Sequence, residues 1–158
     1  MKKTVVVGFG NPILSDDGVG LAVARRVKCM ASGSDCVDVI ELNAGGIRLV
    51  EAISGYGRAL LVDAMVTGTT APGTVSFVDP ANIGSARNIS CVHDMDLPTA
   101  IEMGRALGMD LPEDISVLGI EAACVNEFSE KLTYAVSAAV PLAVEKVMNE
   151  LRKHRGLQ

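Results

Sequence analysis

The sequence alternates between short runs of β-branched and apolar residues and segments with helical spacing, and this alternation constrains its fold more than any other feature. Strand-like runs cover residues 3–9, 36–42, 58–65, 73–80 and 114–121. Helix-like segments cover residues 18–31, 47–54, 97–108 and 133 to about 153. Strands that alternate with helices in a short chain predict a mostly parallel sheet with helices on both faces. We therefore expect an α/β fold with a twisted, mostly parallel sheet of about five strands sandwiched between helices.

Local signals refine this expectation. In the run RALLVDAM at residues 58–65, every residue except Arg58 and Asp63 is apolar. Such a run is typical of a strand that is covered on both faces. Residues 73–80 end at Pro80 and predict an edge strand that reverses direction. Asp96 is the expected N-cap of the helix that follows it. Residues 81–96 have little periodicity and are too long for a turn, so they are expected to form a functional loop.

Composition limits the classes of function. The 158 residues are expected to form one domain, 1–158. The net charge of −5, without a stripe of Lys or Arg, argues against nucleic acid and anionic membranes as partners. No apolar stretch approaches the roughly 20 residues of a membrane-spanning helix. The four cysteines lack the spacing of a zinc site, so we expect reduced, mostly buried thiols in a cytoplasmic protein. A monomer and a weak homodimer both fit this composition.

The loop GFGNPILSDDGVG, residues 8–20, looks at first like a phosphate-binding loop. The third glycine of a G-x-G-x-x-G fingerprint would fall at Ile13, and no Gly-Lys-Ser/Thr follows. Asp16 and Asp17 occupy the turn where the negative charge of a pyrophosphate would lie. We therefore expect no nucleotide cofactor. Gly18 and Gly20 instead allow the loop to close tightly and the first helix to begin.

Polar residues gather where the predicted strands end, which is where open α/β sheets bind their ligands. They are Asp16 and Asp17, Glu41 and Asn43, Asp63, and Glu121. The unpatterned loop adds His93, one of two histidines in the chain. Two carboxylates and one imidazole from three connections predict a divalent-metal site. Zinc, nickel, manganese and iron all suit such a set.

Each of these residues also has a purely structural interpretation. One of the adjacent aspartates is expected to cap the first helix, and Asp16 is the one we assign to that role. Asp63 could hydrogen-bond a neighbouring turn, although a carboxylate after an apolar strand calls for a partner. His93 could be an ordinary surface histidine in a polar loop.

A hydrolytic reaction is compatible with the same residues. No Ser, Thr or Cys has a convincing base beside it, since Cys91 and His93 would point to opposite sides of an extended chain. A metal can polarise a carbonyl group and lower the pKa of a bound water. Alternatively, Asp17 or Asp63 can act as base to a water that is not bound by metal, in an aspartyl-type activity. The sequence leaves both routes open.

Four elements together resemble one family. They are GFGNPILSDDGVG after the first strand, LLVDAM at the end of the third, a lone His followed by DMDLPTA, and LGIE near the end. From Val5 to about Leu151 the chain resembles the nickel–iron hydrogenase maturation endopeptidases. Its HDMDLP sequence is most similar to archaeal members that serve F420-linked hydrogenases.

The resemblance implies a more specific function. Family members remove a C-terminal extension from the hydrogenase large-subunit precursor after nickel insertion, so this precursor is the implied partner. The residues that match the family's metal-contacting and catalytic positions are Asp17, Asp63 and His93, and the nickel is brought by the substrate. The resemblance also implies a twisted sheet of about five strands between helices. The roles of Asp16, Glu41 and Glu121 stay open, and a module that binds the precursor without cutting it is the alternative function.

Overall fold

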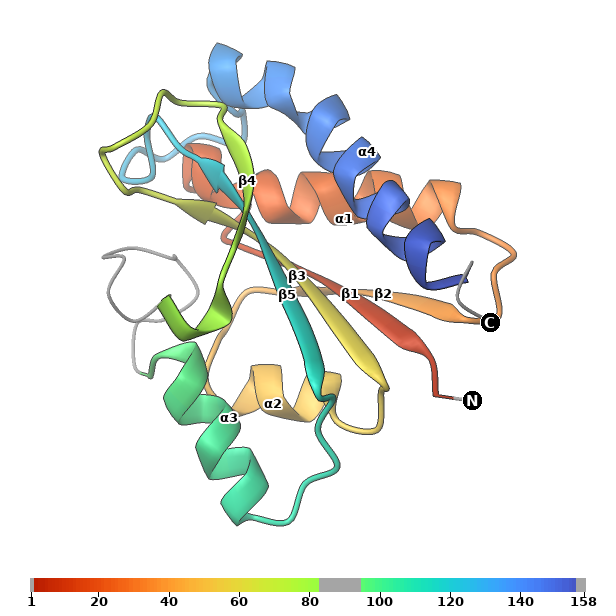
Figure 1. The fold of residues 1–158 in the computed structure, drawn as a ribbon. Helices are drawn as coiled ribbons and strands as arrows, with labels where there is room; N and C mark the ends of the chain where they lie inside the picture. Colours follow the sequence, from red (N-terminus) through yellow and green to blue (C-terminus); the bar gives the residue numbers. More distant parts are fainter. Residues whose placement is uncertain (1, 83–94, 156–158) are drawn as a thin grey trace.

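A computed structural model describes residues 2–82 and 95–155. Its strands are β1 Thr4–Phe9, β2 Val37–Leu42, β3 Arg58–Met65, β4 Val75–Val78 and β5 Asp114–Glu121. They form one sheet in the order β2-β1-β3-β5-β4, in which all neighbours are parallel except β4 and β5 (Figure 1). The predicted fold class is thereby confirmed. The reversed edge strand, β4, is also where the sequence predicts it.

The helices cover both faces of the sheet. They are α1 Val19–Met30, α2 Ile47–Ile53, α3 Leu97–Ala106 and α4 Tyr134–Arg155, with short 3₁₀ helices η1 Ser15–Gly18 and η2 Pro80–Asn82. Helices α1 and α4 lie on one face, and α2 and α3 lie on the other (Figure 1). Asp96 caps α3 as predicted, since its Oδ1 accepts a hydrogen bond of 2.8 Å from the Thr99 N–H. Within the described residues no helix is long and apolar enough to cross a membrane.

Alternating side chains of the central strands build two cores. Val6, Leu60 and Leu118 belong to the core under α1 and α4, whereas Val7 and Leu61 belong to the core under α2 and α3. Side chains along a strand point alternately to opposite faces, so one apolar run fills both cores. All eight residues of β3 are buried, as its continuous apolar run predicts.

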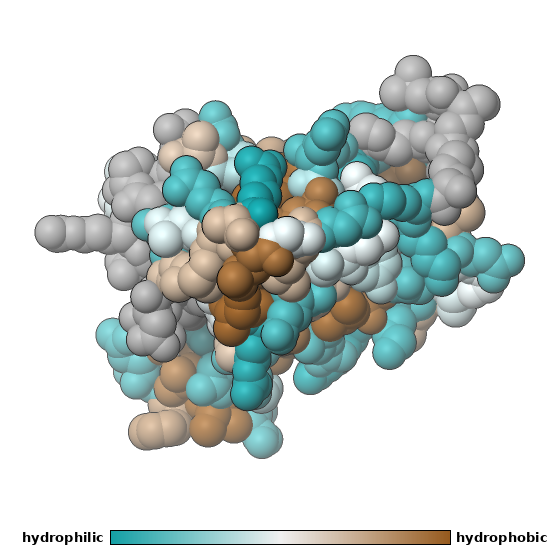
Figure 2. All heavy atoms as spheres, turned by 90° about the horizontal axis from the view of Figure 1, so that it is seen from below, coloured by the Kyte–Doolittle hydropathy of each residue, from teal (hydrophilic) through white to brown (hydrophobic). Residues whose placement is uncertain are grey.

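The face of the molecule made by α2 and α3 is shown from below in Figure 2, where apolar residues gather near the centre of a largely hydrophilic surface. Exposed apolar residues of this layer include Ile47, in the first turn of α2, and Leu107, which ends α3 and is 66% exposed. Leu107 belongs to neither core. Its substitution is therefore a suitable control for changes to exposed apolar residues elsewhere.

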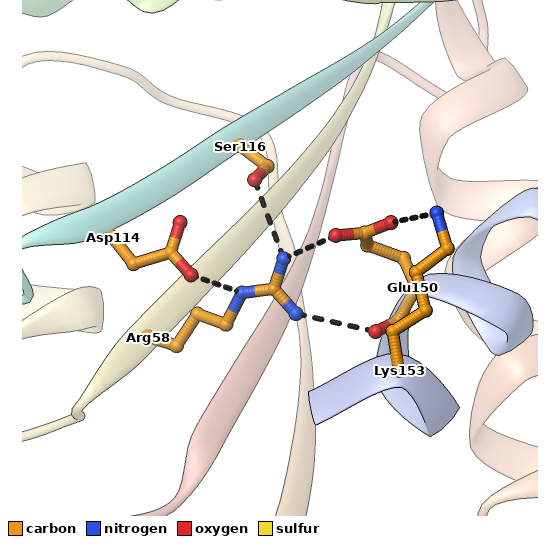
Figure 3. Close-up of polar contacts among 5 residues, drawn as sticks. All are labelled: Arg58, Asp114, Ser116, Glu150 and Lys153. Carbon is orange, nitrogen blue, oxygen red and sulfur yellow. Dashed lines mark hydrogen bonds and ion pairs between the residues drawn. The ribbon is translucent and has the colours of Figure 1, made fainter. Parts of the chain in front are cut away.

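An ion cluster around the buried Arg58 fixes α4 to the sheet at the start of β3 (Figure 3). The Arg58 side chain is 7% exposed, with Nε 2.7 Å from Asp114 Oδ2 and Nη2 2.7 Å from Glu150 Oε1. Lys153 Nζ lies 3.1 Å from the other Glu150 oxygen. Burial raises the pKa of Glu150, but the hydrogen bonds from Arg58 and Lys153 outweigh it and hold the pKa below its ordinary value. The two carboxylates balance the guanidinium, which would otherwise be costly to bury.

The expectation of mostly buried thiols is wrong for the described cysteines. Cys29 and Cys36 are exposed, Cys124 is half-buried, and all three are free; Cys91 lies outside the described residues. Cys29 lies on the solvent-facing stripe of α1, whose opposite stripe is buried, and Cys36 precedes β2 in an exposed turn. Apolar character alone therefore does not place these side chains in a core.

Candidate functional site

The order of the strands creates a switch point between β1 and β3. The chain leaves β1 through α1, which lies on one face, and reaches β3 through α2, which lies on the other. In open α/β sheets such a point leaves a crevice at the carboxyl ends of the strands, and ligands bind there. Asp17 follows β1 in η1, and Asp63 lies near the end of β3. The fold thus brings two of the three predicted site residues to the two sides of the switch point.

Asp17 is held inside the loop that follows β1. Its side chain is buried, and Oδ2 accepts a hydrogen bond of 2.8 Å from the Asn11 N–H. Gly10 has φ +146°, and a Cβ at this position would overlap the carbonyl oxygen of Asp17. Only glycine therefore lets the loop close onto η1. The glycine that suggested phosphate binding serves this close packing.

Asp63 is buried at the same edge of the sheet. It is 2% exposed, and its Oδ1 accepts a hydrogen bond of 2.8 Å from the Ala64 N–H. Its register partner on β5 is Gly119. A carboxylate this deeply buried needs polar partners or a cation.

Gly20 lets the start of α1 lie directly against β1 and β3. A Cβ at Gly20 would overlap the carbonyl oxygens of Phe9 and Val62, so the first turn of α1 lies directly against the ends of β1 and β3. Asp17 precedes this glycine by three residues, and Asp63 follows Val62. The close approach of helix and sheet therefore limits how far η1, which carries Asp17, can lie from β3, which carries Asp63.

Asp16 does not cap α1, so that prediction is wrong. The N-cap of α1 is Gly18, and no side chain bonds the first turn. Asp16 is fully buried and faces the segment after β5 instead. Its Oδ2 accepts from Ala123 N (2.9 Å), Cys124 N (3.0 Å) and Thr133 Oγ1 (2.9 Å), and its Oδ1 accepts from Thr133 N at 2.7 Å. The segment between β5 and α4 has backbone donors outside any strand ladder, and Asp16 satisfies three of them.

The other two acidic residues at strand ends also have structural partners. Glu121, 2% exposed, accepts hydrogen bonds from Thr67 N, Thr67 Oγ1 and Gly68 N at 2.9, 2.9 and 3.0 Å, and so anchors the loop after β3. Glu41 pairs with Arg25 on the surface, with Nη2 2.9 Å from Oε2. These contacts give both residues a role in the fold.

The third predicted ligand, His93, lies outside the described residues, as does most of the unpatterned loop at 81–96. Among the residues that the structure describes, no group of three His, Cys, Asp or Glu side chains is placed to hold a metal ion. The site of Asp17, Asp63 and His93 therefore stays a prediction, of which the structure places the first two members.

These features define an α/β protein with a carboxylate-bearing edge at the switch point of its sheet. Oxygen ligands of this kind suit a hard or borderline cation. Comparison with known proteins gives the family. A sequence model described as hydrogenase maturation protease (HycI) matches residues 21–150, and the chain belongs to that family. The prediction of a hydrogenase maturation endopeptidase is thereby confirmed.

Individual relatives support the assignment over the whole chain. The hydrogenase 2 maturation protease of Escherichia coli strain K12 is 23% identical over 155 residues, covering 96% of this chain and 92% of the relative. The hydrogenase expression/formation protein HupD of Rhizobium leguminosarum bv. viciae is 24% identical, with coverage of 95% and 74%.

Solved structures show the same fold. The hydrogenase maturating endopeptidase HybD from E. coli superposes with a TM-score of 0.80 at 24% identity, covering 96% of this chain and 93% of HybD. The HybD protease from Thermococcus kodakarensis gives a TM-score of 0.72 at 23% identity, with coverage of 93% and 97%. The five-stranded sheet between helices is therefore the architecture of known maturation proteases.

Proposed function

We propose that this chain is the endopeptidase that removes the C-terminal extension of a nickel–iron hydrogenase large-subunit precursor after nickel has been inserted. It recognises the nickel held by the substrate and acts in the cytoplasm. The observation that carries the proposal is the burial of Asp17 and Asp63 at one edge of the sheet in a member of this family. The relative from Escherichia coli that supports it is itself named hydrogenase 2 maturation protease.

Charge favours a cation as the recognised group. Two carboxylates at one edge of a chain with net charge −5 repel each other, and a divalent ion removes this repulsion. Substrate-borne nickel offers such an ion, with Asp17, Asp63 and His93 as the residues that contact it. Metal-free precursor lacks the ion, so the same carboxylates would not draw it in. Recognition of the nickel by these residues would therefore also explain why the precursor is cut only after nickel insertion.

The chemistry needs an activated water and stabilisation of the oxyanion. Nickel held by the substrate would act as a Lewis acid and polarise the scissile carbonyl group. Asp17 and Asp63 orient the substrate through their fixed positions, which the Asn11 and Ala64 N–H groups help to set. In the aspartyl-type route, Asp17 or Asp63 takes a proton from the attacking water.

The test is cleavage of nickel-loaded and nickel-free precursor by the wild type, Asp63→Asn and Glu41→Gln. Glu41→Gln is the matched control because it also neutralises an acid at a strand end, but on the surface. We expect the wild type and Glu41→Gln to cut only loaded precursor, and Asp63→Asn to lose at least about 100-fold in rate. His93→Gln is expected to behave like Asp63→Asn.

Equal cutting of nickel-free precursor would contradict recognition through the metal. Binding of loaded precursor by the wild type without any cutting would support the non-cutting escort module instead.

A further inference from the structure

Three exposed apolar side chains lie at the edge of the sheet that carries the candidate site. Phe128 is 85% exposed, Tyr134 is 91% exposed and Ile13 is 46% exposed. The chain contains only three Phe, two Tyr and no Trp, so two of its five aromatic residues face solvent almost completely here. Aromatic residues exposed in this way are enriched at protein–protein interfaces. We call Ile13, Phe128 and Tyr134 the apolar platform.

The apolar platform is tied to the loop that carries Asp17. Ser129 N donates to the Ile13 carbonyl at 3.0 Å, and Ser15 N donates to the Ser129 carbonyl at 2.8 Å. Asp16 bonds the N–H of Thr133, the residue before Tyr134. In Figure 1 the loop between β5 and α4 lies beside the start of α1, at the end where β3 and β5 finish. The platform and the site loop are therefore one hydrogen-bonded unit.

The short distance along the chain between Ile13 and Asp17 limits how long a bound polypeptide must be to contact the platform and the candidate site together. Ile13 precedes Asp17 by four residues, and four residues span at most about 14 Å even when fully extended. A polypeptide that contacts Ile13 can therefore reach the loop of Asp17 within about four of its own extended residues.

The charges beside the platform indicate the chemistry of its partner. Glu127, Glu130 and Lys131 are exposed, and within the described part of the chain none of them forms an ion pair. Two acids and one base leave a local charge of −1, which adds to the negative charge of the site. An apolar segment flanked by basic residues complements this surface.

We propose that the apolar platform is the docking surface for the precursor polypeptide, and that it binds an apolar segment with basic flanking residues close to the bond that is cut. This inference rests on the proposed function. It assigns to Phe128 and Tyr134 the binding of substrate chain, separately from any contact between Asp17 or Asp63 and metal.

The test compares kcat and KM for nickel-loaded precursor among three proteins: the wild type, the double variant Phe128→Ser/Tyr134→Ser, and Leu107→Ser. Leu107 is the control because it is also apolar and exposed but lies at the end of α3. We expect KM to rise at least about 10-fold in the double variant, with kcat within about twofold of the wild type. The melting temperature should not change, and Leu107→Ser should match the wild type throughout.

A second variant, Glu127→Lys/Glu130→Lys, tests the charge without removing any apolar side chain. We expect it to raise KM at low salt and to approach the wild type as salt increases. This charge variant also tests docking at the platform if the double serine variant is unstable. An unchanged KM in this charge variant would overturn the proposed chemistry of the partner, and an unchanged KM in both variants would overturn docking at the platform.

Failure of the docking inference is distinguishable from failure of the proposed function. A wild type that cuts no precursor would defeat the proposed function itself, whereas a wild type that cuts with the same KM as both variants defeats only the docking inference. Sedimentation of each protein distinguishes a substrate-docking surface from a contact between two copies of this chain. A wild-type dimer that the serine substitutions dissociate, with unchanged cleavage, would make the platform a contact between two copies and would overturn the inference.

Discussion

Replacement of Asp16 by Asn should destabilise the fold far more than an aspartate-to-asparagine change usually does. The side-chain amide of the introduced asparagine would put a donor where the structure has an acceptor. If the amide nitrogen replaces Oδ1, the Thr133 N–H loses its bond of 2.7 Å and faces another donor. A buried donor left unsatisfied costs about 1–3 kcal/mol. The bonds to Oδ2 also become neutral and weaker. We therefore expect a loss of about 2–4 kcal/mol in the free energy of unfolding.

Chemical and thermal unfolding measure this effect. For a chain of this size the expected loss corresponds to a fall of roughly 5–15 °C in Tm. Thr133→Val is the matched control: it removes only the hydroxyl donor to Asp16, keeps the N–H, and should cost about 1 kcal/mol. If Asp16→Asn lost less than about 1 kcal/mol, or no more than Thr133→Val, the account of Asp16 as the anchor of the segment before α4 would be refuted.

Three further predictions test the packing and charges around the sheet. Gly20→Ala should cost about 3 kcal/mol in unfolding free energy, since its Cβ meets backbone that cannot move away, whereas Gly18→Ala should be nearly neutral. Glu121→Gln should increase hydrogen exchange at the Thr67 and Gly68 amides, and unchanged protection would contradict its anchoring role. Glu150→Gln should cost about 1–3 kcal/mol at pH 7. The pKa of Glu150 is lowered from 4.5, so the difference in unfolding free energy between the wild type and Glu150→Gln should shrink as the pH falls below that value. A difference that stays constant with pH would contradict the charged role of Glu150.

The fold could be predicted because its main determinants are local. β-Branched runs, helical spacing and the proline two residues after β4 each act over a few residues, and the burial of all of β3 follows from its own sequence. The placement of Asp17 and Asp63 needed one further step. Carboxyl ends of parallel strands meet at one edge of a sheet, so a residue that follows β1 and one near the end of β3 are brought to the same edge by topology.

The role of Asp16 could not be predicted in the same way. Its partners, Ala123, Cys124 and Thr133, lie 107 to 117 residues away in the sequence. No local pattern in the segment between β5 and α4 predicts backbone N–H groups that need a side-chain acceptor. An aspartate before a helix is most often a cap, and that general preference led to the wrong assignment. The exposure of Phe128 has no local sequence signal either, since an aromatic residue in an apolar chain is ordinarily expected in the core.

The adjacent aspartates of η1, Asp16 and Asp17, have different hydrogen-bond partners because of the local geometry of the helix. Successive residues of a 3₁₀ helix point about 120° apart, so neighbouring side chains cannot face the same partner. Asp16 bonds the segment that leads into α4, and Asp17 bonds Asn11 within its own loop. The first contact fixes where η1 lies relative to β5 and α4, and η1 in turn fixes the backbone from which Asp17 extends. Precision at the candidate site therefore depends on a residue that faces away from it. A change at Asp16 should impair the proposed function of Asp17 even though Asp17 itself is intact.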